Sequence, residues 1–274
     1  MNKKTTKEKV LTYLTLILFA VFFLVPMYVL LSTSLKSFSN VSIKTMWQLP
    51  VDYSFGGFLQ AAKELAPNVI NSFYLVIPAT LISAMLGSLN GYVLSHWKFK
   101  GSDILFALIL FGMFIPYQSV LFPLVLFMQS IGLYGSIPGL ILVHVVYGLP
   151  ITTLMFRNYY KDVPDALTEA AKVDGANIFS IYRHIFFPIS IPSFVVVFIW
   201  QFTNIWNEFL FAVTLTKTQS QPITVALVNL AGSQVVEWNV QMAAALLTAL
   251  PTLLVYIFFG KYFIKGMLAG SVKG

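Results

Sequence analysis

Six long apolar runs divide this chain, and each is long enough to cross a lipid bilayer as a helix. They cover approximately residues 10–33, 69–95, 104–128, 137–158, 187–215 and 241–264. A helix needs about 20 residues to cross the ~30 Å hydrocarbon layer. Hydrophobic residues make up 58% of the chain and charged residues only 10%, whereas soluble domains have roughly 45–50% and about 25%. The sequence therefore predicts an all-α membrane protein with six transmembrane helices.

The first run follows Lys3, Lys4, Lys7 and Lys9 and so resembles a signal peptide. Its apolar stretch is longer than a signal-peptide core, and no A-x-A cleavage pattern follows it. We therefore expect it to be retained as the first transmembrane helix. No internal repeat or linker separates a second domain, so a single helical bundle is expected over residues 1–274.

The basic residues are distributed unevenly between the two sides that six spans create. Of the 17 lysines and arginines, all but Lys36, Lys44, Lys63 and Lys217 lie on the side of the two termini. The positive-inside rule places that side in the cytoplasm, together with the loops at 96–103 and 159–186. The net charge of +7 thus reflects topology and anionic lipid rather than nucleic acid, which would call for a basic face on a soluble fold.

The sequence shows no recognisable catalytic or metal site. It contains no cysteine, and His96, His144 and His184 are far apart without metal-binding spacing. We expect His96 and His184 to be interfacial side chains and His144 to be a packed or hydrogen-bonded helix residue. Phosphate-binding loops, nucleophile elbows and paired carboxylates are also missing from the sequence.

Two loops on the external side are long enough to carry structure. In the loop at 34–68, turn residues precede an apolar and charged stretch at 58–66, which we expect to lie along the membrane interface. The loop at 218–240 combines polar residues with an apolar run from Ile223 to Leu230, and is expected to re-enter or to cover the bundle from outside.

The loop from Lys161 to Phe186 carries charges that cannot lie in hydrocarbon without a cost of several kcal/mol each. Pro164 suits the first turn of a helix that begins near Val163. Leu167, Ala170 and Ala171 would form a narrow face of small residues that permits close approach by another surface. Asp174-Gly175 ends this helix, and a second short helix is expected at 177–186. An ordinary cytosolic helical hairpin that binds nothing explains these features equally well.

The same residues resemble a known family. Glu169-Ala170-Ala171, Asp174-Gly175-Ala176, Pro188 and Pro192 are similar to the EAA motif of binding-protein-dependent ABC importer permeases, in the form found in the carbohydrate-uptake, maltose-permease-like branch. Trp206-Asn207 and the tail Lys265–Gly274 resemble segments of that branch, although Leu268 and Ser271 stand where Thr and Ala are frequent. The resemblance covers essentially the whole chain.

The resemblance implies a type I importer permease fold in a bacterial inner membrane. Its implied partners are a second, similar permease, two ATP-binding subunits that bind the ATP and Mg²⁺, and an extracytoplasmic sugar-binding protein docking on the loops 34–68 and 218–240. The chain itself would hold no cofactor. The ATPase-coupling residues would be Glu169, Ala170, Ala171, Asp174, Gly175 and Ala176. Glu169 would face a basic or polar group of the ATPase.

A sugar inside the membrane needs polar groups and aromatic faces around it. Two stretches supply both: Tyr117 and Gln118 beside Pro116 and Pro123, and the group Trp200, Gln201, Asn204, Asn207 and Glu208. Glu208 is the only acidic residue well inside a span, which marks a functional position. The same side chains would also serve as hydrogen-bonding glue between helices. Tyr147 and His144 are weaker candidates because single aromatic or histidine residues in a bundle usually pack.

The substrate class follows from a finer resemblance. The stretches Gln221–Leu227, Ala243–Ala245 and Leu250–Thr252 resemble those of glucose/mannose and small-glucoside importers. They favour a neutral mono- or disaccharide, or a glucoside such as trehalose, sucrose or glucosylglycerol. One intramembrane carboxylate and no buried Arg or Lys disfavour phosphorylated or strongly anionic solutes. The alternative is an ion-gradient-driven transporter, which would show inverted repeats and a chain of ionisable groups.

Overall fold

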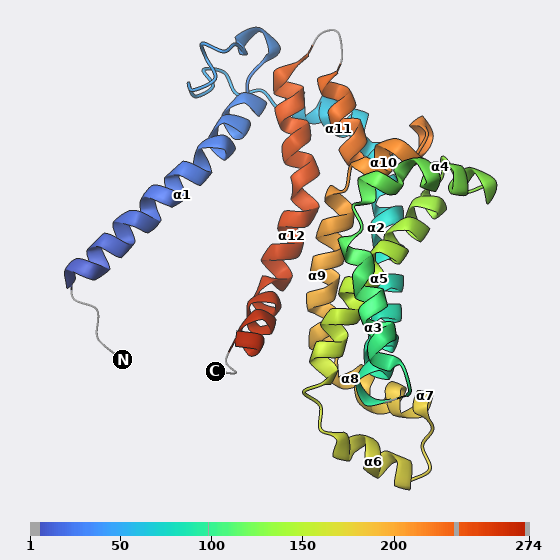
Figure 1. The fold of residues 1–274 in the computed structure, drawn as a ribbon. Coiled ribbons are helices and arrows are strands. Elements are labelled where there is room, and N and C mark those ends of the chain that lie inside the picture. The colour runs from blue at the N-terminus through green and yellow to red at the C-terminus, as the bar shows by residue number, and fades with distance from the viewer. Residues whose placement is uncertain (1–5, 98, 233–235, 272–274) are drawn as a thin grey trace. The chain divides into compact units, whose positions relative to one another are not determined.

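The computed structural model describes residues 6–97, 99–232 and 236–271, and the regular structure of these residues is helical (Figure 1). The α-helices are α1 (Thr6–Ser34), α2 (Gly56–His96), α3 (Ser102–Phe111), α4 (Leu121–Ser130), α5 (Ile137–Tyr160), α6 (Asp165–Val173), α7 (Ile178–Ile181), α8 (Phe187–Ile189), α9 (Ile191–Asn207), α10 (Leu210–Leu215), α11 (Ile223–Ala231) and α12 (Trp238–Ser271). Short 3₁₀ turns are η1 (Phe38–Asn40), η2 (Gly112–Phe114), η3 (Tyr117–Val120) and η5 (Thr218–Ser220), and η4 (Tyr182–Phe186) is a π-helical turn.

Four of the described helices are individually long and apolar enough to cross a membrane. They are α1, α2, α5 and α12, the last over Trp238–Tyr262. Two bent pairs, Ser102–Phe114 with Tyr117–Ser130 and Ile178–Ile189 with Ile191–Asn207, raise the number to six if each pair counts as one span. The all-helical membrane fold expected from the apolar runs is confirmed.

The two bends have local causes in the sequence. The first pair bends by 87°, where Ile115 is extended with ψ 118° immediately before Pro116. A residue that precedes proline is disfavoured in the helical region, so the helix stops there. The second pair bends by 75° at Ser190, two residues before Pro192. A proline thus lies at or directly after each of the two breaks.

Two local expectations differ in detail from the structure. The stretch at 58–66 is not a separate short element, because it forms the first part of the continuous helix α2. The loop helix begins at Asp165 rather than near Val163. The N–H of Val163 donates to the carbonyl of Tyr160 at 3.0 Å and so completes the end of α5, while Pro164 has an extended ψ of 132°.

Contacts group the chain into two compact units, whereas the sequence predicts one bundle without a linker. One unit comprises Met1–Ala66 with Leu227–Leu250, and the other comprises Pro67–Ala226 with Pro251–Gly274. Continuous helices run through both, since α2 and α12 contribute residues to each unit. In both helices the change of unit falls at an internal proline, where one backbone hydrogen bond is missing.

Within the unit of residues 67–226, a glycine pair brings α2 against α5. A Cβ on Gly91 would lie 2.7 Å from the backbone nitrogen of Arg157, and a Cβ on Gly87 would lie 2.9 Å from the backbone carbon of Thr152. Gly87 and Gly91 form a G-x-x-x-G pattern, which allows close backbone approach between membrane helices. This approach places the end of α2 beside the end of α5.

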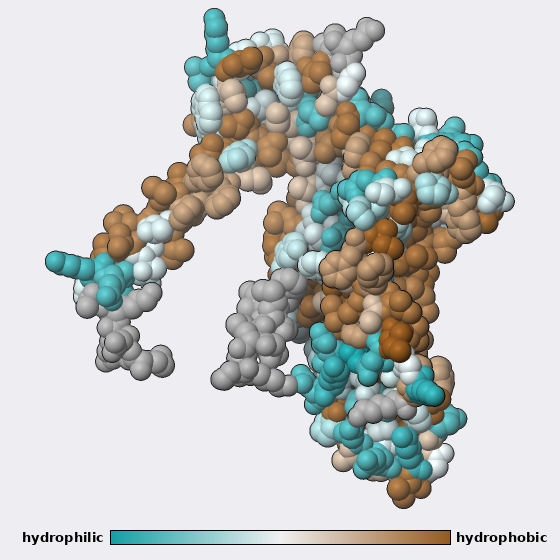
Figure 2. All heavy atoms as spheres, viewed as in Figure 1, coloured by the Kyte–Doolittle hydropathy of each residue, from teal (hydrophilic) through white to brown (hydrophobic). Residues whose placement is uncertain are grey.

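An aromatic cluster fills the region where these helix ends meet. Its fully buried members include Tyr92, Phe156, Tyr160 and Phe186. The rings of Tyr92 and Phe186 lie 4.6 Å apart, and those of Tyr160 and Phe186 lie 5.4 Å apart. The cluster joins α2 and α5 to η4, the segment that follows the α6 loop. In Figure 2 the surface of this unit changes from mostly hydrophobic around α3 and α5 to mostly hydrophilic around α6 and α7.

A chain of hydroxyl groups crosses the cluster. The hydroxyl of Tyr160 donates to Ser190 Oγ at 3.0 Å, and Ser190 Oγ donates to the carbonyl of Phe187. Because a hydroxyl has one hydrogen, Ser88 Oγ must donate to Tyr160 at 2.6 Å and accept from Tyr182 at 2.9 Å. One directed chain thus satisfies four buried hydroxyls and ties the bend at Ser190 to α2 and α5.

Candidate functional site

The loop helix α6 ends in a turn that satisfies its last carbonyls. The N–H of Gly175 donates to the carbonyl of Lys172 at 3.0 Å, and the N–H of Ala176 donates to the carbonyl of Ala171 at 2.9 Å. Gly175 has a φ of +80°, a left-handed conformation that glycine adopts without strain. This pair of bonds is the Schellman motif. The expected helix end at Asp174-Gly175 is confirmed.

The exposed surface of α6 combines apolar side chains with a carboxylate. Leu167 is 44% exposed and Val173 is 88% exposed, and Ala170 is also exposed. The Glu169 carboxylate is exposed and makes no hydrogen bond or ion pair with the described residues. Ala171 instead packs partly against the aromatic cluster, so it does not share the open face with Ala170. This surface is available to a partner that supplies apolar contact and a positive group.

Two cationic or polar side chains hold the surrounding helix ends, and neither was singled out for this from the sequence. His96 at the end of α2 contacts Asp165 on α6 through Nδ1 at 3.0 Å and the carbonyl of Tyr160 through Nε2 at 2.8 Å. Arg157 contacts Asp103 on α3 at 3.0 Å and the carbonyl of Leu94 at 3.1 Å.

The second region expected to be functional lies along α9. Gln201 is buried and its Nε2 donates to Ser83 Oγ on α2 at 2.9 Å. Trp200, Asn204 and Asn207 are exposed and recur at a spacing of four and three residues, so they share one face of α9. Gln201 therefore joins helices, and the open polar and aromatic face of α9 consists of the other three residues.

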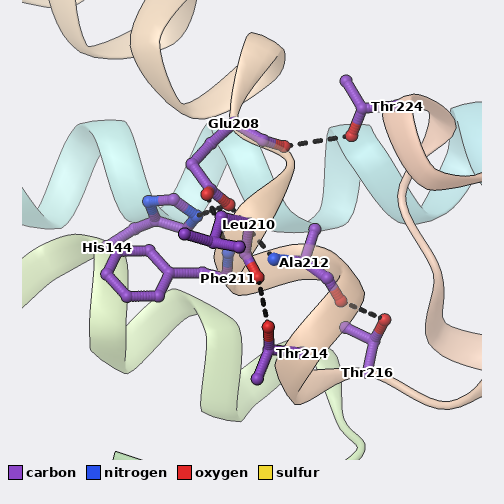
Figure 3. A network of polar contacts seen from close by, with 8 residues as sticks. All are labelled: His144, Glu208, Leu210, Phe211, Ala212, Thr214, Thr216 and Thr224. Atoms are coloured by element: carbon purple, nitrogen blue, oxygen red, sulfur yellow. Dashed lines mark hydrogen bonds and ion pairs between the residues drawn. The ribbon is translucent and has the colours of Figure 1, made fainter. Parts of the chain in front are cut away.

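Glu208 caps the helix that follows α9 (Figure 3). Its carboxylate accepts the backbone N–H groups of Phe211 at 2.7 Å and Ala212 at 3.1 Å. Such a carboxylate satisfies two of the unpaired donors at the start of α10 and suits the positive end of its dipole. Thr224 donates to the carbonyl of Glu208 at 3.0 Å, and His144 Nε2 lies 3.8 Å from the carboxylate.

Phe211 gathers the aromatic candidates around it. Its ring centroid lies 5.3 Å from that of Tyr117, 5.0 Å from that of Tyr147 and 5.9 Å from that of His144. Tyr117 is 39% exposed, and its neighbour Gln118 in η3 is exposed as well. Phe211 was not recognised in the sequence because one phenylalanine among 25 carries no distinctive pattern. The structure thus brings the broken third run next to α10.

The loop after α1 encloses a polar cavity. Lys36 is buried, and its ammonium donates to the carbonyl of Thr45 at 2.6 Å. Burial lowers the pKa of the Lys36 ammonium from its ordinary value. A cavity of about 330 Å³ adjoins it, lined mostly by hydroxyl and amide side chains and by Asp52. The expectation that this loop carries structure is confirmed, with η1 as its regular part.

Comparison with known families identifies the class of the chain. Residues 83–268 match the family described as binding-protein-dependent transport system inner membrane component. A probable ABC transporter permease protein of Pyrococcus horikoshii is 45% identical, over 99% of this chain and 100% of that protein. The xylose/arabinose import permease protein of Haloferax volcanii is 36% identical, over 95% of this chain and 92% of that protein.

The glucose import system permease protein of Saccharolobus solfataricus is 32% identical, over 96% of both chains. Among solved structures, a bacterial ABC transporter involved in the import of alginate contains a chain with a TM-score of 0.81 and 20% identity, over 96% of this chain and 100% of that one. The matched family region includes α6, α9 and their surroundings. The chain therefore belongs to the binding-protein-dependent transport system inner membrane components, as an ABC transporter permease of the carbohydrate-uptake branch.

Proposed function

We propose that this permease forms half of the translocation path of an ATP-driven importer for a neutral mono- or disaccharide or a small glucoside. The carrying observation is that relatives aligned over nearly the whole chain are named as permeases for xylose/arabinose and glucose. A relative from Synechocystis is named for osmoprotective compounds and one from Streptomyces coelicolor for diacetylchitobiose. All four names are compatible with small neutral solutes, the class that the intramembrane charges favour.

The substrate path in this proposal runs along the open face of α9. Trp200, Asn204 and Asn207 supply an aromatic surface and amide groups in one row, and Tyr117 and Gln118 supply the same kinds of group from the break in the third run. Aromatic faces cover sugar C–H surfaces, while amides replace lost hydrogen bonds to water. We assign Gln201 and Glu208 to helix joining and capping rather than to sugar contact.

The coupling surface in this proposal is α6 with the turn from Asp174 to Ala176. Leu167, Ala170 and Val173 offer exposed apolar contact, and Glu169 offers a carboxylate that no described residue engages. Two ATP-binding subunits carry ATP and Mg²⁺, and one of them receives this surface. A second, homologous permease completes the path, and an extracytoplasmic binding protein delivers the sugar to the loops that follow α1 and α10. Both termini then lie in the cytoplasm.

The first experiment is a pull-down of the tagged chain from native membranes, followed by ATP hydrolysis measurements with added sugars. Recovery of an ATPase, a second permease and a sugar-binding protein, with hydrolysis stimulated by one neutral sugar, supports the proposal and identifies the solute. A chain that is recovered alone and moves solute without ATP would instead support the ion-gradient alternative.

The coupling surface has a separate test. Glu169→Lys reverses the charge of the exposed carboxylate, so we expect sugar-stimulated uptake to fall strongly while the chain still inserts. Lys161→Glu, at an exposed residue before α6, is the matched charge reversal outside the proposed surface and should leave uptake nearly intact. Normal stimulation and uptake in the Glu169→Lys complex would refute the coupling assignment.

Replacements on α9 separate sugar contact from helix joining. Trp200→Ala should raise the sugar concentration for half-maximal uptake without a large change in thermal stability. Gln201→Ala should lower thermal stability instead, because it leaves Ser83 without its partner on α9. The reverse pattern would show that the open face does not contact the sugar.

A further inference from the structure

The loop after α1 is held by a row of hydrogen-bond donors from the end of that helix (Figure 1). The hydroxyl of Ser32 donates to the carbonyl of Gln48 at 2.7 Å, and that of Tyr28, four residues earlier, donates to the carbonyl just before it at 2.8 Å. Lys36 follows at the same spacing, and its ammonium donates to the carbonyl of Thr45 at 2.6 Å. Three donors four residues apart thus fix the loop against the helix end.

Lys36 is a buried cation that uses little of its hydrogen-bonding capacity. Its side chain is only 3% exposed. An ammonium carries three donors, and within the described part of the chain it bonds only the carbonyl of Thr45. Asp52 lines the same cavity but is exposed, and no ion pair joins it to Lys36 among the described residues. Because a buried charge without a counter-ion is costly, this position favours a ligand that brings a negative charge.

The cavity beside Lys36 has a lining suited to a small anionic group. Its volume is about 330 Å³, at the low end of the roughly 300–1,000 Å³ of ligand pockets. Five other lining residues carry a hydroxyl or an amide, namely Ser39, Asn40, Ser42, Thr45 and Gln48. Hydroxyl and amide groups donate hydrogen bonds to carboxylate oxygens. The described lining contains no aromatic ring, so the cavity lacks the face that a sugar ring would cover.

Apolar side chains accompany this polar cavity. Leu49 and Val51 line it and are 64% and 89% exposed, and the neighbouring Trp47 is 57% exposed. In protein interfaces, apolar contacts of this kind exclude water from the central group that contributes most to binding. A charge pair enclosed in this way is screened little by salt and selects strongly for the correct partner. The combination fits a protein surface that presents one carboxylate among apolar contacts.

We propose that this cavity receives an Asp or Glu side chain of the extracytoplasmic binding protein, and that the carboxylate pairs with the Lys36 ammonium. The hydroxyl and amide groups of the lining donate to the remaining lone pairs of the carboxylate. Because the donors of α1 already hold the loop, little conformational freedom is lost on docking. This inference rests on the proposed function, which places the loop outside the cytoplasm and supplies the partner.

The test measures how tightly the binding protein recovered in the pull-down docks on the complete transporter in lipid nanodiscs. Lys36→Met removes the charge and keeps most of the side-chain length, so we expect the dissociation constant to rise about thirtyfold or more. Lys36→Arg keeps the charge and should retain most of the affinity. Lys44→Met makes the same change at an exposed lysine of the same loop, and should alter the dissociation constant by about threefold or less.

A purely structural role of Lys36 would give a different pattern. Ser32→Ala removes the neighbouring bond to the loop and leaves every charge in place. If Lys36 only holds the loop, Ser32→Ala should weaken docking as much as Lys36→Met does, and this result would refute the charge pair. In our proposal only Lys36→Met weakens docking strongly. Its effect should persist from about 0.1 M to about 1 M salt, because an enclosed pair is screened less than exposed charges.

A double-mutant cycle identifies the group that enters the cavity. Each Asp and Glu of the binding protein is changed in turn to Asn or Gln. One of these changes should weaken docking strongly when Lys36 is present and hardly at all in Lys36→Met. Weaker docking in Lys36→Met without any such coupled carboxylate would assign the cavity to another occupant, such as a lipid phosphate or a free anion, and would overturn the proposal.

The inference and the proposed function fail in different ways. If the transporters with Lys36 and with Lys36→Met bind the binding protein equally tightly, the inference is wrong and the importer function stands. If no binding protein docks on the unchanged transporter, the proposed function is wrong and the inference is wrong with it.

Discussion

The carboxylate of Glu208 accepts the backbone N–H of Phe211 at 2.7 Å. Glu208 was expected well inside a span, but it follows the last residue of α9 and caps the start of α10. It also sets the position of Phe211, whose ring lies against Tyr117 and Tyr147. The carboxylate thereby shapes the region around the proposed path through the backbone that it caps.

Replacement of Glu208 should reveal a capping role. Glu208→Ala removes both bonds to the start of α10, so we expect the free energy of unfolding to fall by about 1 kcal/mol. Glu208→Gln keeps one acceptor oxygen and should lose less. Thermal unfolding followed by tryptophan fluorescence measures both. ATP-driven uptake should persist in Glu208→Gln, and its complete loss with normal stability would point to a carboxylate that carries a proton or an ion.

The hydroxyl chain through Ser88 should be a strong stabilising element. Ser88→Ala leaves the hydroxyls of Tyr160 and Tyr182 each without one buried partner. A buried polar group without its partner costs about 1–3 kcal/mol. We expect Ser88→Ala and Tyr160→Phe together to cost less than the sum of the single changes, since each interrupts the same chain. Additive losses in a double-mutant cycle of thermal stability would contradict the directed chain.

The contact between α2 and α5 should tolerate no side chain at Gly91. An alanine Cβ there would lie 2.7 Å from Arg157 N and Phe156 Cβ, so backbone must shift, at a cost on the order of 1–3 kcal/mol. Gly260→Ala makes the same change in α12, where nothing lies within 4 Å, and should alter stability by roughly 0.5 kcal/mol or less. Similar unfolding temperatures for the two variants would argue against the close approach.

The turn after α6 should require glycine at position 175 because of its backbone conformation. Lack of space for a side chain is not the reason. Gly175 has a φ of +80°, and nothing lies within 4 Å of the place that a Cβ would occupy, so Gly175→Ala strains the turn by about 1 kcal/mol. Asn visits this conformation more readily, and Gly175→Asn should retain more coupled uptake than Gly175→Ala. Gly175→Pro should retain least, because it excludes positive φ and removes the bond to Lys172. The lowest coupled uptake in Gly175→Asn, below that of Gly175→Ala and Gly175→Pro, would contradict this prediction.

Much of the fold could be predicted from the sequence because a segment in hydrocarbon has few possible backbone structures. Runs of about 20 apolar residues have to be helices, since every backbone group must be paired within the segment. The end of α6 could also be predicted, because it depends only on the neighbouring residues Asp174 and Gly175. The start of α6 was misplaced because Val163 bonds back to α5, a choice that Pro164 alone does not reveal. The stretch at 58–66 was separated from α2 because its charges suggested an interfacial piece, although no residue there ends a helix.

Composition, run length and local spacing were enough to predict the membrane class, the family and a loop that faces water. The role of each side chain followed instead from the tertiary structure. Gln201 and Asn204 look alike in the sequence, yet one bonds Ser83 on α2 and the other is exposed. His96 and Asp165 are 69 residues apart, and no local pattern predicts their contact. Such roles depend on which helices approach one another, and that is set by packing across the whole chain.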